Sequence, residues 1–198
     1  MPENPFNNLN NFIPRIFILL MEDEDVIVWS NDNFLNRSDF KAESNPSKFE
    51  DAHSYIKYHH TWTINSEMHD GKIFFVIDNI QLSTLFYRHL SWIREHHNIP
   101  YLLKHEQGHF DLAESLLPII KEKIKIEFKD KPFPTRGQNE EQQKQFARED
   151  SGIIISKELK KWFVELEKKR NQYDEETEFG HNLDKQKEYN EKFERLRK

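Results

Sequence analysis

Two histidines with a glutamate between them stand near the middle of the chain, in the segment His105-Glu106-Gln107-Gly108-His109. On a helix, positions i and i+4 lie on one face about one turn apart, so both imidazoles can reach one metal ion. A zinc ion with three protein ligands keeps a fourth position for water, whose pKa it lowers toward neutrality. Glu106 follows the first histidine and can take the proton from that water. The pattern predicts a hydrolytic zinc site with His105 and His109 as ligands and Glu106 as general base.

The third ligand is not expected from the same helix. At about 100° per residue, Asp111 lies off the face of the two histidines and Glu114 lies nearly opposite His105. Ser115 stands where the longer HExxHxxGxxH motif has its third histidine, so that motif is absent. The third ligand must therefore come from another part of the chain.

The best supplier is the acidic segment 172–177, Gln-Tyr-Asp-Glu-Glu-Thr. We expect Asp174 as the third ligand, with Glu176 as the second choice and His181 as the third. An acidic stretch on a charged helix is also typical of a simple solvated face, and spacing alone favours that alternative. Tyr173 can place a phenol near the oxyanion that develops during attack on a carbonyl, although most such tyrosines only pack.

The histidine pair lies in a predicted helix over residues 101–117, which begins just after Pro100. Apolar residues flank the pair, as expected of a buried helix. Gly108 costs this helix about 1 kcal/mol relative to alanine, which predicts that another group packs closely against it. Pro118 is expected either to kink the helix or to begin a new one.

Strands are predicted before this helix and helices after it. Residues 26–29 and 53–65 are rich in aromatic and β-branched residues, and Asp70-Gly71 predicts a hairpin turn into a further strand at 72–80. Residues 82–95 show helical spacing, although the start of a strand is also compatible with them. A loop is expected at 129–137, helix over 140–180 with a possible break at Ser151-Gly152, and a helix-compatible tail over 182–198. This order predicts an α+β fold with a small antiparallel sheet.

The composition narrows the possible functions. The chain has 198 residues, a formal net charge of −6 and no basic stripe, so nucleic acid is not expected as a partner. It has no cysteine, so any metal must be held by histidine and carboxylate. Residues 12–21 are too short and too interrupted for a transmembrane segment, and no signal peptide is evident, so we expect a cytoplasmic protein. We expect an N-terminal extension over 1–24 and a single catalytic domain over 25–198.

Two segments resemble the DUF922 family, whose members are described as zinc-dependent proteases of the zincin group. They are Leu103 to Glu114, around the histidine pair, and Tyr173-Asp174-Glu175-Glu176-Thr177. Trp29 and Ser38-Asp39-Phe40 also resemble family elements, so the likeness covers roughly residues 26–190. It implies a zincin-like fold, zinc on His105 and His109, Glu106 as base, and a Tyr173-Asp174 segment that faces the metal. Many members have a histidine where this chain has Phe179, so His181 does not correspond to it.

Other residues have weaker claims on the site. Asp39 and Asp111 are expected either to orient the metal-binding histidines or to act as ordinary capping or surface carboxylates. His59 and His60 are adjacent on a predicted strand and point to opposite faces, so both cannot serve one site. By analogy with zincins, Phe74 to Ile77 is the candidate strand edge for an extended substrate.

Three functions remain open at this level. The first is a zinc metallopeptidase that hydrolyses a peptide or protein substrate. The second is a non-catalytic zincin scaffold that binds zinc or a protein partner, and the presence of Glu106 argues against it. The third is a helical interaction protein in which the histidine pair is incidental.

Overall fold

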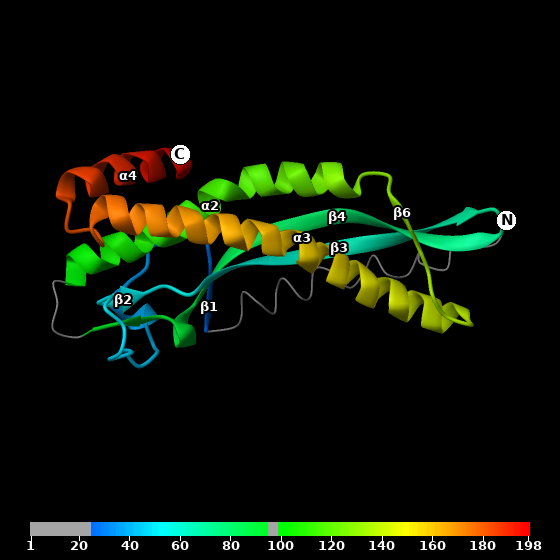
Figure 1. Ribbon diagram of the computed structural model, residues 1–198, viewed down its shortest axis with the longest axis horizontal. Helices are drawn as coiled ribbons and strands as arrows, with labels where there is room; N and C mark the ends of the chain where they lie inside the picture. The colour runs from blue at the N-terminus through cyan, green and yellow to red at the C-terminus, as the bar shows by residue number, and fades with distance from the viewer. Residues whose placement is uncertain (1–24, 95–98) are drawn as a thin grey trace. The chain divides into compact units, whose positions relative to one another are not determined.

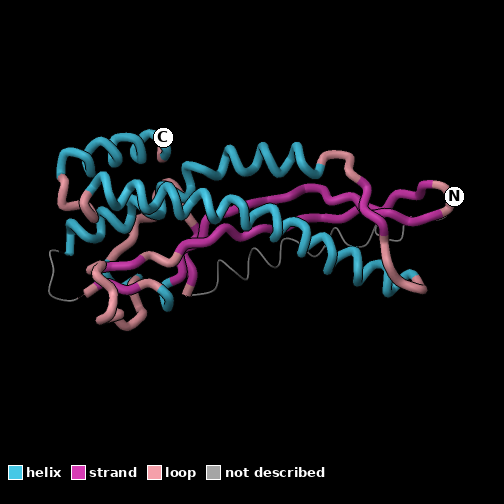
Figure 2. Tube along the Cα trace, viewed as in Figure 1, coloured by secondary structure: helices cyan, strands magenta, loops and turns pink. Residues whose placement is uncertain are grey.

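The computed structural model describes residues 25–94 and 99–198. The predicted N-terminal extension, residues 1–24, lies outside the described residues. Contacts group the described chain into two compact units. We call residues 60–82 and 119–162 the hairpin unit, and residues 25–59, 83–94, 99–118 and 163–198 the site unit. Four long elements, β3, β4, α2 and α3, each contribute residues to both units. Figure 1 labels these elements, and Figure 2 colours the helices cyan and the strands magenta.

The elements of the described chain combine short strands, one long β-hairpin and three helices (Figure 1). The strands are β1 (Val26–Val28), β2 (Ala52–His53), β3 (Ile56–His69), β4 (Lys72–Tyr87), β5 (Trp92–Ile93) and β6 (Pro132–Pro134), and the helices are α2 (Ile99–Phe128), α3 (Glu140–Thr177) and α4 (Leu183–Leu196). One sheet has the order β1-β4-β3 with β6 also paired to β4, and β2 pairs with β5 in a separate ribbon. All pairings with given register are antiparallel. The predicted α+β class with a small antiparallel sheet is therefore confirmed.

The turn between β3 and β4 is the one that the sequence predicts. Asp70 and Gly71 have φ angles of 50° and 74°, so both central residues adopt the left-handed conformation that a tight hairpin requires. Aspartate tolerates this conformation better than most residues, and glycine adopts it without steric cost.

The predicted helix over 82–95 is wrong. Residues 82–87 continue β4, and they are followed by a 3-10 turn, Arg88–Leu90, and by β5. Leu85, Phe86 and Tyr87 pair with β1 across the sheet, and Phe86 is fully buried. A short apolar run has no decisive period of its own, and here the pairing with β1 selects the strand.

α2 runs further than the sequence predicts at both ends, whereas α3 lies within the predicted helix over 140–180. Pro118 lies inside α2, so it does not begin a new helix. α3 passes through Ser151 and Gly152 without a break. No helix in the described part of the chain combines the length and apolarity that a membrane span requires.

Each unit has its own apolar core. In the site unit, Phe86 lies between Phe40 and Phe110, with ring centroids 5.3 Å and 5.9 Å apart. In the hairpin unit, Phe75 stacks on Phe133 at 5.4 Å. Phe86 and Phe110 are fully buried, and this apolar packing holds the first half of α2 against β4 within the site unit.

Candidate metal centre

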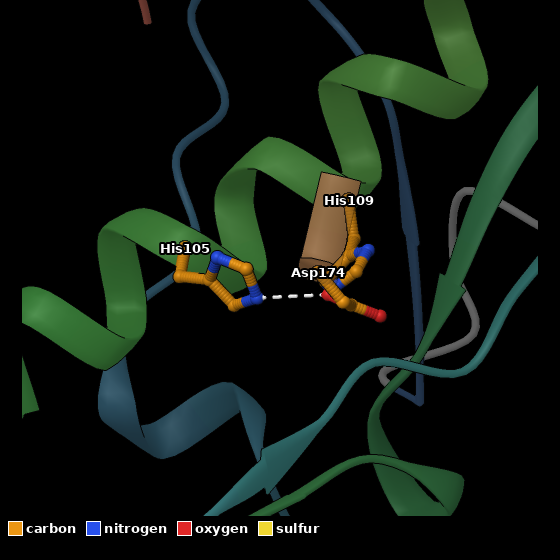
Figure 3. A group of neighbouring side chains, drawn as sticks. All are labelled: His105, His109 and Asp174. Atoms are coloured by element: carbon orange, nitrogen blue, oxygen red, sulfur yellow. Dashed lines mark hydrogen bonds and ion pairs between the residues drawn. The ribbon is translucent and has the colours of Figure 1, made fainter. Parts of the chain in front are cut away.

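Three side chains of the site unit converge on one point (Figure 3). His105 and His109 project from α2, and Nε2 of each lies 3.1 Å and 3.0 Å, respectively, from Oδ1 of Asp174 on α3. Their ligand atoms all lie within 4.8 Å of one another. The donor set, two imidazole nitrogens and a carboxylate oxygen, is the type that three-ligand zinc sites use. This group could hold a metal ion, and its residues fit zinc.

The other candidates for the third ligand are engaged elsewhere. Glu176 accepts hydrogen bonds from Gln172 and Tyr189. Glu114 accepts a hydrogen bond from Thr84, as expected from its position off the histidine face. Of the acidic candidates that the sequence offers, Asp174 is the one that the structure brings to the histidine pair.

His181 is the remaining candidate, and it also lies away from the ligand group. Its ring packs against that of Tyr101, with centroids 5.0 Å apart. His181 also lines a pocket that lies next to the ligand group. It is not a member of the group that could hold a metal ion.

The charges of the three residues depend on one another. Burial lowers the pKa of His109 to about 3, and the positive charge of Arg170 adds to this effect. Burial also acts to lower the pKa of His105, but the hydrogen bond with Asp174 and the charge of Glu106 outweigh it and raise that pKa above its ordinary value. Burial acts to raise the pKa of Asp174, but the hydrogen bonds from both histidines lower it well below its usual range. Asp174 is therefore ionised and His109 neutral at neutral pH, the forms in which both groups bind metals.

His105 is oriented by a hydrogen bond that the sequence did not predict. Its Nδ1 lies 3.1 Å from Oε1 of Gln186 on α4. An Nδ1–H that donates to this oxygen would leave Nε2, which lies next to Asp174, as the nitrogen that binds a metal ion once its proton is displaced. Nδ1 of His109 is buried and has no such partner among the described residues. Of the two histidines, only His105 has an Nδ1 that is hydrogen-bonded to a described side chain.

Tyr173 packs behind His105. The tyrosine is fully buried, and its ring stacks on that of His105 with centroids 4.7 Å apart and an angle of 9° between the planes. Its hydroxyl donates to the backbone oxygen of His105 at 3.2 Å and accepts from Nε2 of Gln186 at 2.8 Å. It does not appear among the residues that line the pocket. This position fits support of His105 rather than the oxyanion contact that the sequence suggested for Tyr173.

Gly108 makes this packing possible. A Cβ atom at residue 108 would lie 2.1 Å from the hydroxyl oxygen of Tyr173 and 2.7 Å from Cζ. The close approach that the sequence predicted at this helical glycine is therefore present, and the group that approaches is Tyr173.

The turn that follows α3 packs against His105. Glu178, Phe179 and Gly180 have φ angles of 50°, 53° and 80°. A Cβ atom at Gly180 would lie 3.0 Å from Cβ of His105, so the backbone approaches the ligand too closely for a larger residue. Thr177 secures the turn, since its hydroxyl accepts a hydrogen bond from the amide of Gly180 at 3.1 Å.

Glu106 is buried next to the ligand group and lines the pocket. Ser54, which is also fully buried, donates its hydroxyl to Oε2 of Glu106 at 2.5 Å. Burial raises the pKa of Glu106, although the charge of His105 and the hydrogen bond from Ser54 partly oppose this effect. A carboxylate with a raised pKa is a stronger base than one in water.

A pocket of about 830 Å³ opens beside these residues within the site unit. Its lining combines the candidate ligands, aromatic side chains and charged groups. Its charged and titratable lining side chains include Lys48, His53, Lys57, His105, Glu106, His109, Arg170, Asp174 and Glu178. Its volume is in the range of sites that enclose a small molecule or a short segment of a larger one.

Sequence reasoning missed three residues here. Arg170 lines the pocket and precedes Asp174 by four residues. This spacing places both on one face of a helix, so the sequence could have indicated Arg170. Ser54 and Gln186 lie 52 and 81 positions from their partners Glu106 and His105. No local pattern could have found these two.

The carboxylates expected to orient the histidines have other partners. Asp39 ends a second 3-10 turn, Arg37–Asp39, where its carboxylate accepts a hydrogen bond from the amide of Asn36, the residue that caps this turn, and it pairs with Arg88. Asp111 accepts hydrogen bonds from Trp29 at 2.8 Å and from Gln107 at 3.0 Å, and it pairs with Arg197. Asp39 is therefore the capping carboxylate of the alternative prediction, whereas Asp111 is a buried ion-pair partner that neither prediction describes. The residue that lies next to Nδ1 of a ligand histidine is Gln186.

The strand edge suggested for substrate is also occupied. Residues 74–76 pair with β6, while β4 pairs with β3 on its other side. These residues belong to the hairpin unit, whereas the ligand group belongs to the site unit. The prediction that Phe74 to Ile77 offers a free edge is wrong, because β6 covers it.

The chain matches no family model, no curated protein and no solved structure. What the centre does must therefore be inferred from its own geometry and chemistry.

Proposed function

We propose that the protein is a zinc-dependent metallopeptidase of the zincin type, related to the DUF922 family that it resembles, and that it hydrolyses peptide bonds. One observation carries the proposal. Nε2 of both His105 and His109 lies about 3 Å from the same oxygen of Asp174, beside a buried glutamate that faces a pocket. Metal ligands next to a potential base are a combination that can hydrolyse an amide.

His105, His109 and Asp174 would hold the zinc ion. When bound, zinc would acidify a water molecule and polarise the substrate carbonyl. Because Ser54 occupies Oε2 of Glu106, we assign the proton-accepting role to Oε1. Gln186 keeps the Nδ1 proton of His105 in place throughout.

The reaction requires two proton movements through Glu106. The oxygen of water attacks the carbonyl carbon as one of its protons passes to Glu106, and the π electrons of the carbonyl move to its oxygen. The C–N bond then breaks, the carbonyl forms again, and Glu106 returns its proton to the departing nitrogen. The products are a carboxylic acid and an amine, between which the second proton of the water passes to leave a carboxylate and an ammonium group, and Glu106 ends in its starting state.

The burial of Glu106 favours a catalytic site over a site that only binds a metal ion. Removing a carboxyl group from water is unfavourable, and Glu106 is not one of the three ligands. A scaffold that only binds zinc has no need for this residue. The same carboxyl group is what a peptidase needs next to its metal.

Replacement of Glu106 by glutamine tests the proposal. Zinc-loaded wild-type protein should cleave members of a broad peptide library, and Glu106→Gln should retain zinc but lose cleavage by a factor of about 10² to 10⁴. Glu178→Gln is the matched control, since Glu178 lines the same pocket but is exposed, and it should cleave normally. Zinc-loaded wild-type protein that cleaves nothing would favour the non-catalytic scaffold, and full activity of Glu106→Gln would contradict the assigned base.

A further inference from the structure

Arg170 is a charged side chain that has no role in the proposed proton transfers or in holding the metal ion. It lies on α3 one turn before Asp174 and lines the same pocket. Its side chain is only 12% exposed. Nη2 donates to the backbone oxygen of Ser54 at 3.0 Å, and Nη1 lies 3.6 Å from a carboxylate oxygen of Glu167. Arginine remains charged at any physiological pH, so this is a fixed positive charge beside the candidate centre.

The guanidinium and Glu106 are held by the same residue. Ser54 accepts a hydrogen bond from Arg170 through its backbone oxygen and donates one to Glu106 through its hydroxyl. The positive charge of Arg170 affects a ligand and the base. It helps to lower the pKa of His109, and it partly offsets the rise that burial causes in the pKa of Glu106. Arg170 is therefore near the base and the ligands at once.

The other cations and donors of the pocket are less suited to bind a developing negative charge. Lys48 and Lys57 are exposed, and water weakens the electrostatic effect of an exposed charge. His53 stacks on Trp92 and lies 3.6 Å from Glu50, and burial lowers its pKa. Tyr173, which the sequence suggested, is buried behind His105.

We propose that Arg170 binds the carbonyl oxygen of the scissile peptide bond as that oxygen becomes negatively charged. This inference rests on the proposed peptidase function and assigns a second catalytic residue to it. No bond forms to Arg170 and no proton leaves it, since it contributes only charge and hydrogen bonds. A guanidinium has five N–H donors, and the contacts to Ser54 and Glu167 engage only its two terminal nitrogens, so donors remain for the substrate.

The kinetic test compares three variants. Arg170→Met should lower kcat by about 100-fold or more while KM changes little, because the lost interaction exists only in the transition state. Arg170→Lys keeps the charge but loses the planar fork of donors, and it should lose less than Arg170→Met. Lys168→Met is the control, since Lys168 is 69% exposed on the same helix, and it should behave as wild type. Each variant is loaded with one equivalent of zinc, and its thermal unfolding is measured beside that of the wild type. A variant that unfolds at a lower temperature has a folding defect and is not used to judge the role of Arg170.

A binding measurement separates this inference from the proposed function. Methylphosphonate carries a tetrahedral anionic centre, and calorimetry can measure its affinity for zinc-loaded protein without any turnover. We expect a loss of roughly tenfold in Arg170→Met, a smaller loss in Arg170→Lys and none in Lys168→Met. If the protein cleaves peptides but Arg170→Met keeps wild-type kcat and methylphosphonate affinity, Arg170 has no such role. If no peptide is cleaved but the affinity falls as expected, Arg170 binds an oxyanion and the peptidase proposal fails.

Discussion

The two compact units bury very different kinds of side chain. Of the buried polar residues that the structure describes, the hairpin unit contains only Thr61 and Ser151. The site unit buries a connected set that includes His105, Glu106 and His109. Burying polar groups is unfavourable unless they are paired, so such a concentration has to be explained by what the groups do together. This contrast fits a hairpin unit whose core is mostly apolar and a site unit whose buried polar groups serve the proposed metal centre.

The largest expected effect separates two helical glycines, one in each unit. Gly108→Ala should lower the free energy of unfolding by about 2 kcal/mol or more, because the new Cβ would meet Tyr173 and the clash outweighs the better helix propensity of alanine. Gly152→Ala is the matched change in the hairpin unit, where the Cβ would lie 3.2 Å from the ring of Trp62. Its effect should stay within about 1 kcal/mol. Urea denaturation measures both, and equal effects would remove the special role of Gly108.

The next effect concerns the residue that orients His105. Gln186→Leu should weaken zinc binding by about 10- to 100-fold, because Nδ1 of His105 loses its acceptor and the ring loses its fixed orientation. Ser151→Ala provides the comparison in the hairpin unit, where it removes the hydrogen bond from Nε1 of Trp62. This second change should cost about 1 kcal/mol of stability and leave zinc affinity unaltered. A competitive zinc chelator gives the affinities, and wild-type affinity in Gln186→Leu would contradict the supporting role.

These two comparisons also show which parts of the centre were readable from the sequence. The pairing of His105 with His109 follows from helix periodicity, which needs no knowledge of the rest of the fold. The acidic segment that contains Asp174 was identified correctly, although spacing alone did not favour it over a solvated face. Gln186 and Ser54 could not be found, because only tertiary packing brings them to their partners.

The fold shows the same division between local and tertiary information. The hairpin turn at Asp70-Gly71 was predicted because its backbone conformation depends on those two residues. The end of β4 was assigned to a helix because Leu85 and Phe86 fit either period, and their pairing with β1 decided the outcome. The sequence left packing and oxyanion contact open for Tyr173 for a related reason, since nothing in it tells which side of His105 the phenol occupies.

A pH dependence is expected for the site unit alone. The pKa of His105 is raised above its ordinary value by the hydrogen bond with Asp174 and the charge of Glu106, so a proton competes with zinc there up to a higher pH than at an ordinary histidine. Zinc affinity should therefore increase with pH, by at most about tenfold per pH unit, until His105 is deprotonated, and then level off. The pKa of His109 is about 3, so His109 should add no dependence near neutrality. Chelator competition between about pH 5 and 9 should show one proton released per zinc at the acidic end and none once His105 is deprotonated, and two released protons would contradict this assignment.

The smallest expected effect belongs to Tyr173→Phe. This change keeps the ring against His105 and removes only the hydroxyl, so it should cost about 1 kcal/mol of stability. Peptide cleavage should fall by less than tenfold, since the hydroxyl lies behind the ligand. A loss of kcat near that expected for Arg170→Met would return the oxyanion role to Tyr173.

A zinc-bound crystal structure tests the central assignment most directly. An anomalous difference map collected at the zinc edge should show one peak, about 2.0–2.2 Å from Nε2 of His105, Nε2 of His109 and an oxygen of Asp174. A peak that involves the histidines without Asp174, or a peak at another part of the chain, would contradict the metal centre described above.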